Sequence, residues 1–307
     1  MPAARYTRGR RRPMESGWWL GIDGGGTKTA AVILDARRRH CGRGHGGPCN
    51  IATCDDATLL DSVLTARREA LRAAGLPAHT RVRGACAGVA GYTARSRRAA
   101  FLQMLRETIP ADTHRVEPDF AAAYWGASEG EAGLAVIAGT GAVLYGRDSR
   151  GRAVRWDGLG FLFGDSGSGF DMGRQALCHA LPRSRGGARP NSFARRVWSE
   201  IGAECEEDVI EWTYRRFDPA RIAALAGAVG RWAEEGDPSA RRIVALCAGR
   251  LAEGAVRCLD RMKLPPETAP IWLLGGLWRT TPLLRMHFLR SVRAHARRAG
   301  RLVGCLR

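Results

Sequence analysis

The chain has 307 residues, more than one domain usually contains, so we expect two domains. Hydrophobic residues make up 45% of the sequence, which supplies a substantial core and excludes a disordered chain. No stretch approaches the roughly 20 uncharged apolar residues that a membrane-crossing helix needs. The composition therefore predicts a globular protein without membrane spans.

The net charge of +18 is concentrated at the two ends of the chain. Residues 1–12 hold five arginines and residues 285–307 hold seven, and neither stretch contains an acidic residue. Between them, 36 basic residues stand against 30 acidic ones, a balance that is ordinary for an enzyme. The distribution of charge therefore argues against nucleic acid as a partner.

The nine cysteines form neither an even disulfide framework nor a C-x-x-C pair. No apolar signal-peptide core precedes the first expected strand, so the sequence favours the reducing cytoplasm. One group, made of His40, Cys41, His45, Cys49 and Cys54, could surround a metal ion. Its spacing fits no compact zinc pattern, and the alternative is a loop that happens to contain thiols.

The first 16 residues are polar and rich in arginine, and they show no hydrophobic periodicity. We expect a disordered basic lead there, with Met14 as an alternative start. From Trp18 onward, an apolar run, a glycine turn at residues 23–27 and a second run at residues 30–34 predict a hairpin. The elements expected next are a strand near 39–44, a helix over 57–74, a buried strand over 82–89, a helix over 96–105 and a short strand at 115–116.

A glycine turn recurs in the second half of the chain. Residues 133–138 and 142–145 predict two strands, and Gly139-Thr140-Gly141 joins them about 115 residues after the first glycine turn. This repetition indicates two related halves. The elements expected afterwards are a loop over 156–169, a helical region from Asp171 to Leu259 with breaks near 183–190, 218–219 and 237–238, a strand over 271–274 that ends at Gly275-Gly276, and a helix to about Arg293.

Three glycine turns at strand ends can present backbone N–H groups to phosphate oxygens, because a residue without Cβ lets the main chain approach closely. Any one of them alone could be an ordinary tight turn. Three together, two of them with a threonine, favour a bound nucleotide. Neither a P-loop pattern nor a G-x-G-x-x-G that opens a helix occurs at these turns, which disfavours P-loop and dinucleotide-binding folds.

The ordered series of glycine motifs resembles a known family. The segments that carry the resemblance are Gly21–Thr29, Gly139–Ala142, Gly164–Gly169 and Gly275–Trp278. They are similar to the N-acetylglucosamine kinase branch of the BadF/BadG/BcrA/BcrD ATPase family, within the actin-like ATPase and sugar kinase superfamily. The resemblance spans about residues 17–290 and implies an α/β fold of two ribonuclease-H-like lobes with a nucleotide cleft between them. The implied division is a lead at 1–16, a first lobe at 17–117, a second lobe with a helical insertion at 118–293 and a basic tail at 294–307.

The resemblance implies which residues bind ATP and magnesium. Asp23 would lie near the Mg²⁺ ion. The phosphates would be held by Gly24, Gly25, Gly26 and Thr27, with Lys28 beside them, and by Thr140 and Gly141, while Gly275 and Gly276 would border the adenosine. For Lys28, a solvated side chain that points away from the nucleotide is an open alternative, since neighbours on a strand face opposite sides.

The resemblance also implies the residues that act on the sugar. Asp119 matches the aspartate that accepts the proton of the attacking hydroxyl, although from the sequence alone it could simply cap a helix. Asn50 and Asp165 match sugar-contacting residues, against the alternatives of a loop turn and a helix cap. Gly158 lies in a segment where the family shows Gly-Gly-Trp-Gly. This chain has Leu159 in place of the tryptophan, which puts the identity of the sugar in doubt.

The function that the resemblance implies is an ATP-dependent kinase that phosphorylates the 6-hydroxyl of N-acetylglucosamine or glucosamine, in the cytoplasm, with association into a homodimer left open. One alternative is an ATPase that activates a dehydratase through an iron–sulfur cluster; it would need cysteines near the second glycine turn, and none lies between Cys86 and Cys178. The other is a non-catalytic sugar sensor of the repressor type, which would need a helix-turn-helix region before Trp18.

The carboxyl end departs from the family pattern. Residues 294–307 carry no amphipathic stripe and no acidic partner for their arginines. From this we expect a shifted reading frame or a truncation shortly after residue 290, which would leave apolar surface exposed on the first lobe.

Overall fold

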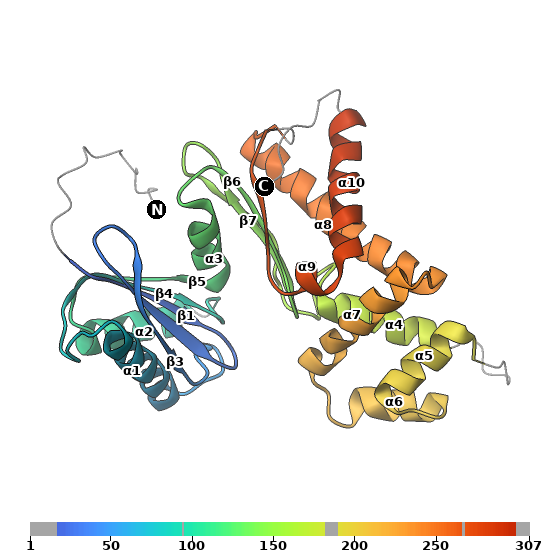
Figure 1. Ribbon diagram of the computed structural model, residues 1–307, viewed down its shortest axis with the longest axis horizontal. Coiled ribbons are helices and arrows are strands. Elements are labelled where there is room, and N and C mark those ends of the chain that lie inside the picture. Colours follow the sequence, from blue (N-terminus) through green and yellow to red (C-terminus); the bar gives the residue numbers. More distant parts are fainter. Residues whose placement is uncertain (1–16, 94, 182–189, 266–267, 299–307) are drawn as a thin grey trace. The chain divides into compact units, whose positions relative to one another are not determined.

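The computed structural model describes residues 17–93, 95–181, 190–265 and 268–298 (Figure 1). The predicted lead at 1–16 lies outside these residues, as does the tail beyond 298. Contacts divide the chain into two compact units, Met1–Gly126 and Ala127–Arg307. This division falls inside a helix, nine residues after the boundary at 117 that the sequence suggests, so Asp119 groups with the first unit.

The first unit is a five-stranded sheet with the strand order β3-β2-β1-β4-β5. Its elements are β1 (Trp19–Gly24), β2 (Thr29–Leu34), β3 (His40–Gly46), α1 (Asp56–Ala73), β4 (Val82–Val89), α2 (Arg95–Thr108), β5 (Ala111–Pro118) and α3 (Asp119–Ser128). β1 pairs antiparallel with β2 and parallel with β4, which confirms the predicted hairpin around the glycine turn. β5 is longer than the predicted 115–116, because it is a largely exposed edge strand whose polar residues give no hydrophobic signal.

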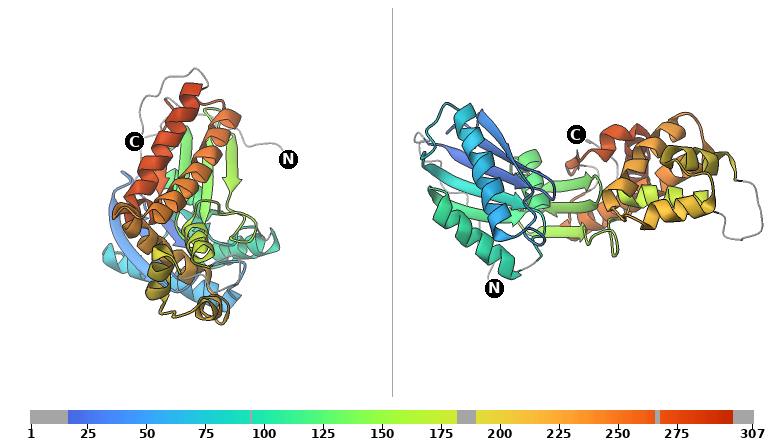
Figure 2. Two further views of the ribbon diagram at one scale, coloured as in Figure 1. Left: turned by 90° about the vertical axis from the view of Figure 1, so that its right-hand side faces the viewer. Right: turned by 90° about the horizontal axis from the view of Figure 1, so that it is seen from below.

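The core of this unit lies between the sheet and the helices α1 and α2, which cover the same face (Figure 2). Leu20 and Ile22 of β1 face Leu59 and Val63 of α1 and Phe101 of α2 in one buried cluster. These strand residues alternate with exposed neighbours, as expected for a strand with one covered face.

The packing of α1 on β3 depends on glycine at every second position of the strand. A Cβ on Gly42, Gly44 or Gly46 would lie between 2.0 and 2.2 Å from a backbone oxygen of α1. The helix therefore rests directly on the strand backbone. We expect Gly44→Ala to lower the free energy of unfolding by about 1–3 kcal/mol, the usual cost of overpacking, as measured by guanidinium unfolding followed by circular dichroism.

A matched control is available in the other unit. Gly249 also lies in a regular element, but a Cβ there would meet no atom within 4 Å. Gly249→Ala should therefore leave stability unchanged or raise it by up to about 1 kcal/mol, because alanine favours a helix more than glycine does. Equal effects of the two substitutions would contradict the packing argument.

The opposite face of the first sheet is open over part of its area. A cavity of about 1010 Å³ is lined by small and apolar residues, among them Gly21 and Cys86, and by charged residues such as Arg38 and Arg115. Trp19 lies at its side and is 46% exposed. The shifted reading frame or truncation near residue 290, and the exposed apolar surface expected from it, stay a prediction.

The second unit contains a four-stranded sheet with the order β8-β7-β6-β9, which repeats the order of the first four strands of unit one. Its strands are β6 (Gly133–Ala138), β7 (Ala142–Arg147), β8 (Ala153–Asp157) and β9 (Ile271–Leu274). The repeated order supports two related halves. β8 was not among the expected strands, because it is a short edge strand that carries an arginine and gives little hydrophobic signal.

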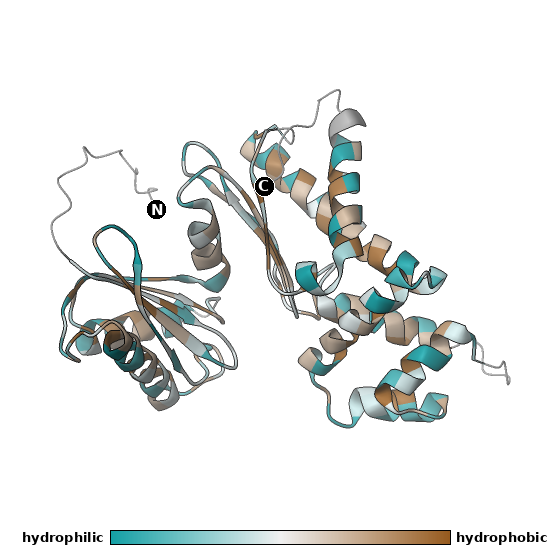
Figure 3. Cartoon of the chain, in the orientation of Figure 1, coloured by the Kyte–Doolittle hydropathy of each residue, from teal (hydrophilic) through white to brown (hydrophobic). Residues whose placement is uncertain are grey.

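The helices of the second unit are α4 (Gly169–Ala180), α5 (Ser192–Ile201), α6 (Glu206–Tyr214), α7 (Pro219–Glu234), α8 (Pro238–Met262), α9 (Leu277–Thr280) and α10 (Pro282–Arg298). α8 packs against the sheet and α10 packs against α8 (Figure 1). Hydrophobic and hydrophilic residues alternate along α10 (Figure 3), and the helix continues beyond the expected end at Arg293. None of the helices in the described ranges is long and apolar enough to cross a membrane.

Candidate active site

The first glycine turn joins β1 to β2 and has a fixed base with an exposed tip. The N–H of Gly25 donates to the carbonyl of Lys28 at 2.9 Å, and the carbonyl of Gly25 accepts the N–H of Cys49 at 2.8 Å. Gly26, Thr27 and Lys28 are exposed. A turn held in this way can present its backbone N–H groups to an anion without first having to become ordered.

Two carboxylates lie at the same end of the first sheet as this turn. Asp23, the penultimate residue of β1, is in parallel register with Gly88 of β4. The Cα of Asp119 lies 3.6 Å from the point that a Cβ on Gly88 would occupy, and such a Cβ would meet Ala122 of α3 at 2.3 Å. Glycine at position 88 therefore lets α3 begin against β4, with Asp119 close to the end of β1. Both aspartates are exposed.

Asp119 is the first residue of α3, directly after Pro118 at the end of β5. Its Oδ1 accepts the N–H of Phe120 at 2.8 Å. The carboxylate thus contacts the first turn of the helix, and the same exposed group stands at the carboxyl end of the strands. The geometry is compatible with both roles.

Asn50 belongs to the same edge of the first unit. It forms a parallel bridge with Ala90, and the N–H of Ala90 donates to the carbonyl of Gly24 at 2.8 Å. The side-chain oxygen of Asn50 accepts the N–H of Ala52 at 2.9 Å, so the local turn that the sequence left open is present. This turn fixes the side chain and directs its amide nitrogen away from the N–H that it caps.

The two glycine turns of the second unit also lie at one end of their sheet. Ile137 of β6 is in parallel register with Leu274 of β9, and each turn begins shortly after this pair. Gly275 has φ +100, and a Cβ on it would lie 2.2 Å from the carbonyl oxygen of Ala138, so only glycine fits. The carbonyl of Gly139 accepts the N–H of Gly169 at 2.8 Å, which brings the turn to the start of α4.

The side chain of Asp165 lies against the turn at 139–141. A Cβ on Gly141 would lie 2.7 Å from Asp165 Oδ2. Burial is the main influence on this carboxyl group and raises its pKa above the ordinary value, while N–H groups of Ala142 and Gly160 partly oppose the rise. Gly158, with φ +71, packs against Val143 at the same end of the sheet. The predicted site residues of each unit are thus brought together at one end of that unit's sheet.

Sequence reasoning assigned no role to Asp157, the last residue of β8. Its two carboxylate oxygens accept the N–H groups of Asp165 and Ser166 at 2.6 and 2.9 Å. Asp157 also has φ +62, a conformation that non-glycine residues seldom adopt. An Asp-Gly pair signals a turn, but no local pattern predicts a contact with residues eight and nine positions away.

The thiol and imidazole group at residues 40–54 has the properties of a packed segment. Cys49 is fully buried, and burial raises the pKa of its thiol to about 12, which disfavours the thiolate form that binds metals. Within the described ranges, histidine, cysteine and acidic side chains form no cluster of three or more that could hold a metal ion. For Mg²⁺, which prefers oxygen ligands and keeps several waters, a single exposed carboxylate such as Asp23 is an adequate protein ligand.

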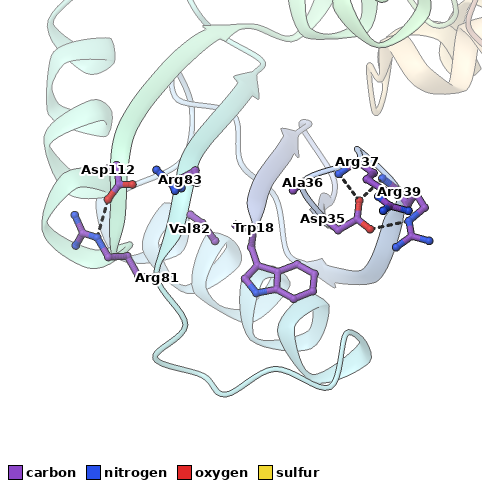
Figure 4. Close-up of a pocket in the computed structure, with 10 residues that line it drawn as sticks. Trp18, Asp35, Ala36, Arg37, Arg39, Arg81, Val82, Arg83 and Asp112 are labelled. Carbon is purple, nitrogen blue, oxygen red and sulfur yellow. Dashed lines mark hydrogen bonds and ion pairs between the residues drawn. The ribbon is translucent and has the colours of Figure 1, made fainter. Parts of the chain in front are cut away.

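A cavity of about 530 Å³ lies at the opposite end of the first sheet (Figure 4). It is lined by Trp18 and by two ion pairs, Asp35–Arg39 at 2.7 Å and Arg81–Asp112 at 2.8 Å. None of the predicted site residues lines it. Ligands of open α/β sheets bind beyond the carboxyl ends of the strands, and this cavity lies at the other ends of β1 and β4.

The strand order of the two units and the glycine turns at their sheet ends define the two-lobed fold of the actin-like ATPases and sugar kinases. Residues 20–293 match the BadF/BadG/BcrA/BcrD ATPase family, and the chain belongs to this family. Both conclusions confirm the resemblance drawn from the glycine motifs.

Similar proteins include several sugar kinases. The N-acetylmuramic acid/N-acetylglucosamine kinase of Clostridium acetobutylicum is 26% identical over 259 residues, which cover 84% of both chains. The N-acetyl-D-glucosamine kinase of Dictyostelium discoideum is 25% identical over 274 residues, with 84% of each chain covered. Among solved structures, a candidate N-acetylglucosamine kinase from Chromobacterium violaceum shares the fold with a TM-score of 0.72 at 24% identity, and the match covers 94% of each chain.

Proposed function

We propose that this chain is an ATP-dependent kinase that transfers a phosphoryl group to the 6-hydroxyl of an amino sugar, N-acetylglucosamine or glucosamine. Family membership and the names of the relatives support the sugar kinase class. The observation that most supports the proposal is that Asp23, Asn50, Asp119 and the first glycine turn all lie at one end of the first sheet. Phosphoryl transfer needs phosphate donors, a metal and an aligned base, and these residues can supply each of them.

In this proposal the glycine turns bind the nucleotide. The phosphate oxygens accept hydrogen bonds from the exposed backbone of the first turn and from the turn of the second unit, and the third turn borders the adenosine. The residues assigned to these contacts are Gly24, Gly25, Gly26, Thr27, Lys28, Thr140, Gly141, Gly275 and Gly276. The exposed ammonium of Lys28 adds positive charge beside the first turn.

Asp23 is assigned to the Mg²⁺ that accompanies ATP. When bound, the metal neutralises charge on the phosphate oxygens. The exposed carboxylate at the end of β1 offers the oxygen ligand that this ion prefers.

Asp119 is assigned the role of the base. Its exposed carboxylate accepts the proton of the sugar hydroxyl as that oxygen attacks the phosphorus, and its position at the start of α3 holds it in place. The amide of Asn50, with Gly158 and Asp165 of the second unit, is assigned to polar contacts with the sugar.

The choice of sugar is affected by Leu159, which stands where the family has tryptophan. Leu159 is 62% exposed and cannot supply the aromatic ring that would lie along the sugar. The same loop carries Phe163, which is 83% exposed. These exposed side chains make an apolar contact with the sugar available, although the tryptophan is missing.

The test is ADP release by the purified full chain with Mg²⁺ and ATP, measured with N-acetylglucosamine, glucosamine, N-acetylmuramic acid, glucose and no sugar. We expect N-acetylglucosamine or glucosamine to raise the rate well above the background without sugar. Phosphorus–proton coupling in the NMR spectrum of the product should place the phosphate on the oxygen at C6.

Two results would contradict the proposal. If no hexose or amino sugar raises ADP release while a non-sugar acceptor does, the chain is not a sugar kinase. If the phosphate is found on another hydroxyl, the kinase class stands and the assigned position is wrong. We further propose that the protein acts in the cytoplasm, in accord with the free thiol state of every described cysteine.

A further inference from the structure

Asp157 closes a loop of the second unit by joining its two ends. The loop runs from Gly158 to Gly164, and its far end is held because both oxygens of Asp157 accept backbone N–H groups, those of Asp165 and Ser166. Hydrogen bonds to a carboxylate are stronger than those to a neutral acceptor. The carboxylate therefore acts as a clip between the end of β8 and the segment that precedes α4.

The segment that Asp157 holds is in contact with the turn at 139–141. Asp157 accepts the N–H of Asp165 at 2.6 Å, the shorter of its two bonds. The side chain of Asp165 lies against Gly141. The segment that follows also returns to the turn, since the N–H groups of Gly169 and Phe170 donate to Gly139 and Thr140 at 2.8 and 3.1 Å. Any shift of residues 165–170 would therefore move the backbone of the turn.

The backbone at position 157 has a conformation that favours glycine. Its φ of +62 lies in the left-handed region, which glycine adopts freely and which aspartate and asparagine adopt more readily than other residues. The loop would close with less strain if residue 157 were glycine, but it would then have no acceptor for the two N–H groups.

We propose that Asp157 is a positioning residue, which through Asp165 holds the turn at 139–141 in the conformation that binds the nucleotide phosphates. This inference rests on the proposed function, because that function assigns the turn to phosphate. Asp157 itself contacts neither substrate in this proposal. Its effect should appear in nucleotide affinity and in the mobility of the turn.

The test compares Asp157→Gly with Asp157→Asn. Glycine removes both acceptors and adopts this φ without strain, but it also adds backbone freedom, which a control glycine substitution must match. Asparagine tolerates the same conformation and keeps one acceptor oxygen. We expect Asp157→Gly to raise the Kd for MgADP, measured by titration calorimetry, about tenfold, and Asp157→Asn to recover part of that loss.

The chain offers a matched control at the other end of β7. Asp148 also accepts two backbone N–H groups, those of Arg150 and Arg152, at 2.9 and 2.8 Å. Asp148→Gly removes two such bonds, together with the ion pair between Asp148 Oδ2 and Arg152 at 2.7 Å, from a turn that carries no predicted site residue. Its Kd for MgADP should equal that of the unaltered protein.

Two further readouts separate positioning from general stability. Amide exchange at residues 139–142 should accelerate in Asp157→Gly and not in Asp148→Gly. In a double-mutant cycle with Asp165→Asn, the loss of MgADP affinity in the double variant should be smaller than the sum of the losses in the two single variants. The reason is that Asp157 acts through Asp165.

Each outcome decides the matter. A folded Asp157→Gly variant with unchanged Kd and unchanged exchange overturns the positioning role and leaves the kinase proposal intact. If that variant does not fold, Asp157→Asn decides: a raised Kd there with an unchanged Kd in Asp148→Gly supports the role, and an unchanged Kd in a folded Asp157→Asn overturns it. If the unaltered chain binds MgADP but phosphorylates no sugar, the kinase proposal fails and the Kd comparison still tests Asp157. If it binds no nucleotide, both proposals fall.

Discussion

Replacing Asp119 with asparagine is expected to lower the rate of sugar-dependent ADP release at least about 100-fold, the usual loss when a positioned base is removed. Asparagine caps helices as well as aspartate does, so the contact with the N–H of Phe120 can be kept. The substitution therefore separates the two roles that the geometry allows. The affinity for MgADP and the melting temperature should stay close to those of the unaltered protein.

The matched control is Asp61→Asn, which removes an exposed carboxylate from α1, a helix that carries no assigned residue. It should leave the rate unchanged. Near-normal turnover in Asp119→Asn would show that Asp119 only caps α3, and some other group would then have to accept the proton. A loss of rate together with a large fall in melting temperature would point to the capping role as well.

The second large effect is expected from Arg250→Met, which breaks a buried ion pair in the second unit. Asp171 is 5% exposed, and its Oδ2 accepts from Arg250 Nη1 at 2.5 Å and from the N–H of Gly167 at 2.9 Å. Methionine would fill much of the space but leave the carboxylate buried without its main cation. Because about a third of the Arg250 side chain is exposed, we expect a loss of about 2–3 kcal/mol in unfolding free energy at pH 7, at the lower end for such pairs.

The loss should shrink as the pH falls. Burial alone would raise the pKa of Asp171, but hydrogen bonds from Arg250 and Gly167 outweigh burial and hold the pKa below its ordinary value. The paired carboxylate thus stabilises the native state above the pKa of the unfolded chain, and this stability is lost as the pH falls through the lower native pKa. In Arg250→Met, burial dominates and the carboxyl group can become neutral. Guanidinium unfolding at pH 7 and pH 4 measures the difference.

Arg257→Met is the control for this prediction, since it breaks an exposed ion pair on the same helix. Arg257 pairs with Glu253 at 2.8 Å, and both side chains are more than half exposed. Its removal should cost at most about 1 kcal/mol. If both substitutions cost the same, or if the Arg250→Met deficit grows at low pH, the role of the buried pair is wrong.

Much of the strand framework could be read from the sequence. The bounds of β4, β6 and β9 coincide with those expected, because each is a short and largely uncharged run, and runs of this kind between polar or glycine-rich segments are typical of strands. Two of the edge strands, β5 and β8, are harder to predict. The sequence predicts only residues 115–116 of β5 and no strand at β8, because the polar residues in these edge strands leave little hydrophobic alternation.

The site residues divide in the same way. The glycine turns and Asp119 could be found from the sequence, because each belongs to a contiguous pattern at the end of a strand. Their meeting at one sheet end depends on register, which sets Asp23 beside Gly88 and so brings it near the start of α3. No local pattern in the sequence predicts the register between β1 and β4.

The class of fold, the family and the elements that carry the chemistry can be inferred from local patterns such as glycine turns and apolar runs, because these patterns lie in neighbouring residues. The contact of Asp157 with the segment next to the second glycine turn, and the pairing of Asp171 with an arginine 79 residues away, become visible only in the folded molecule. Both contacts join residues that are not neighbours along the chain, so no local sequence pattern predicts them. They exist because packing brings the ends of different elements together, and a buried polar group must then find its partner there.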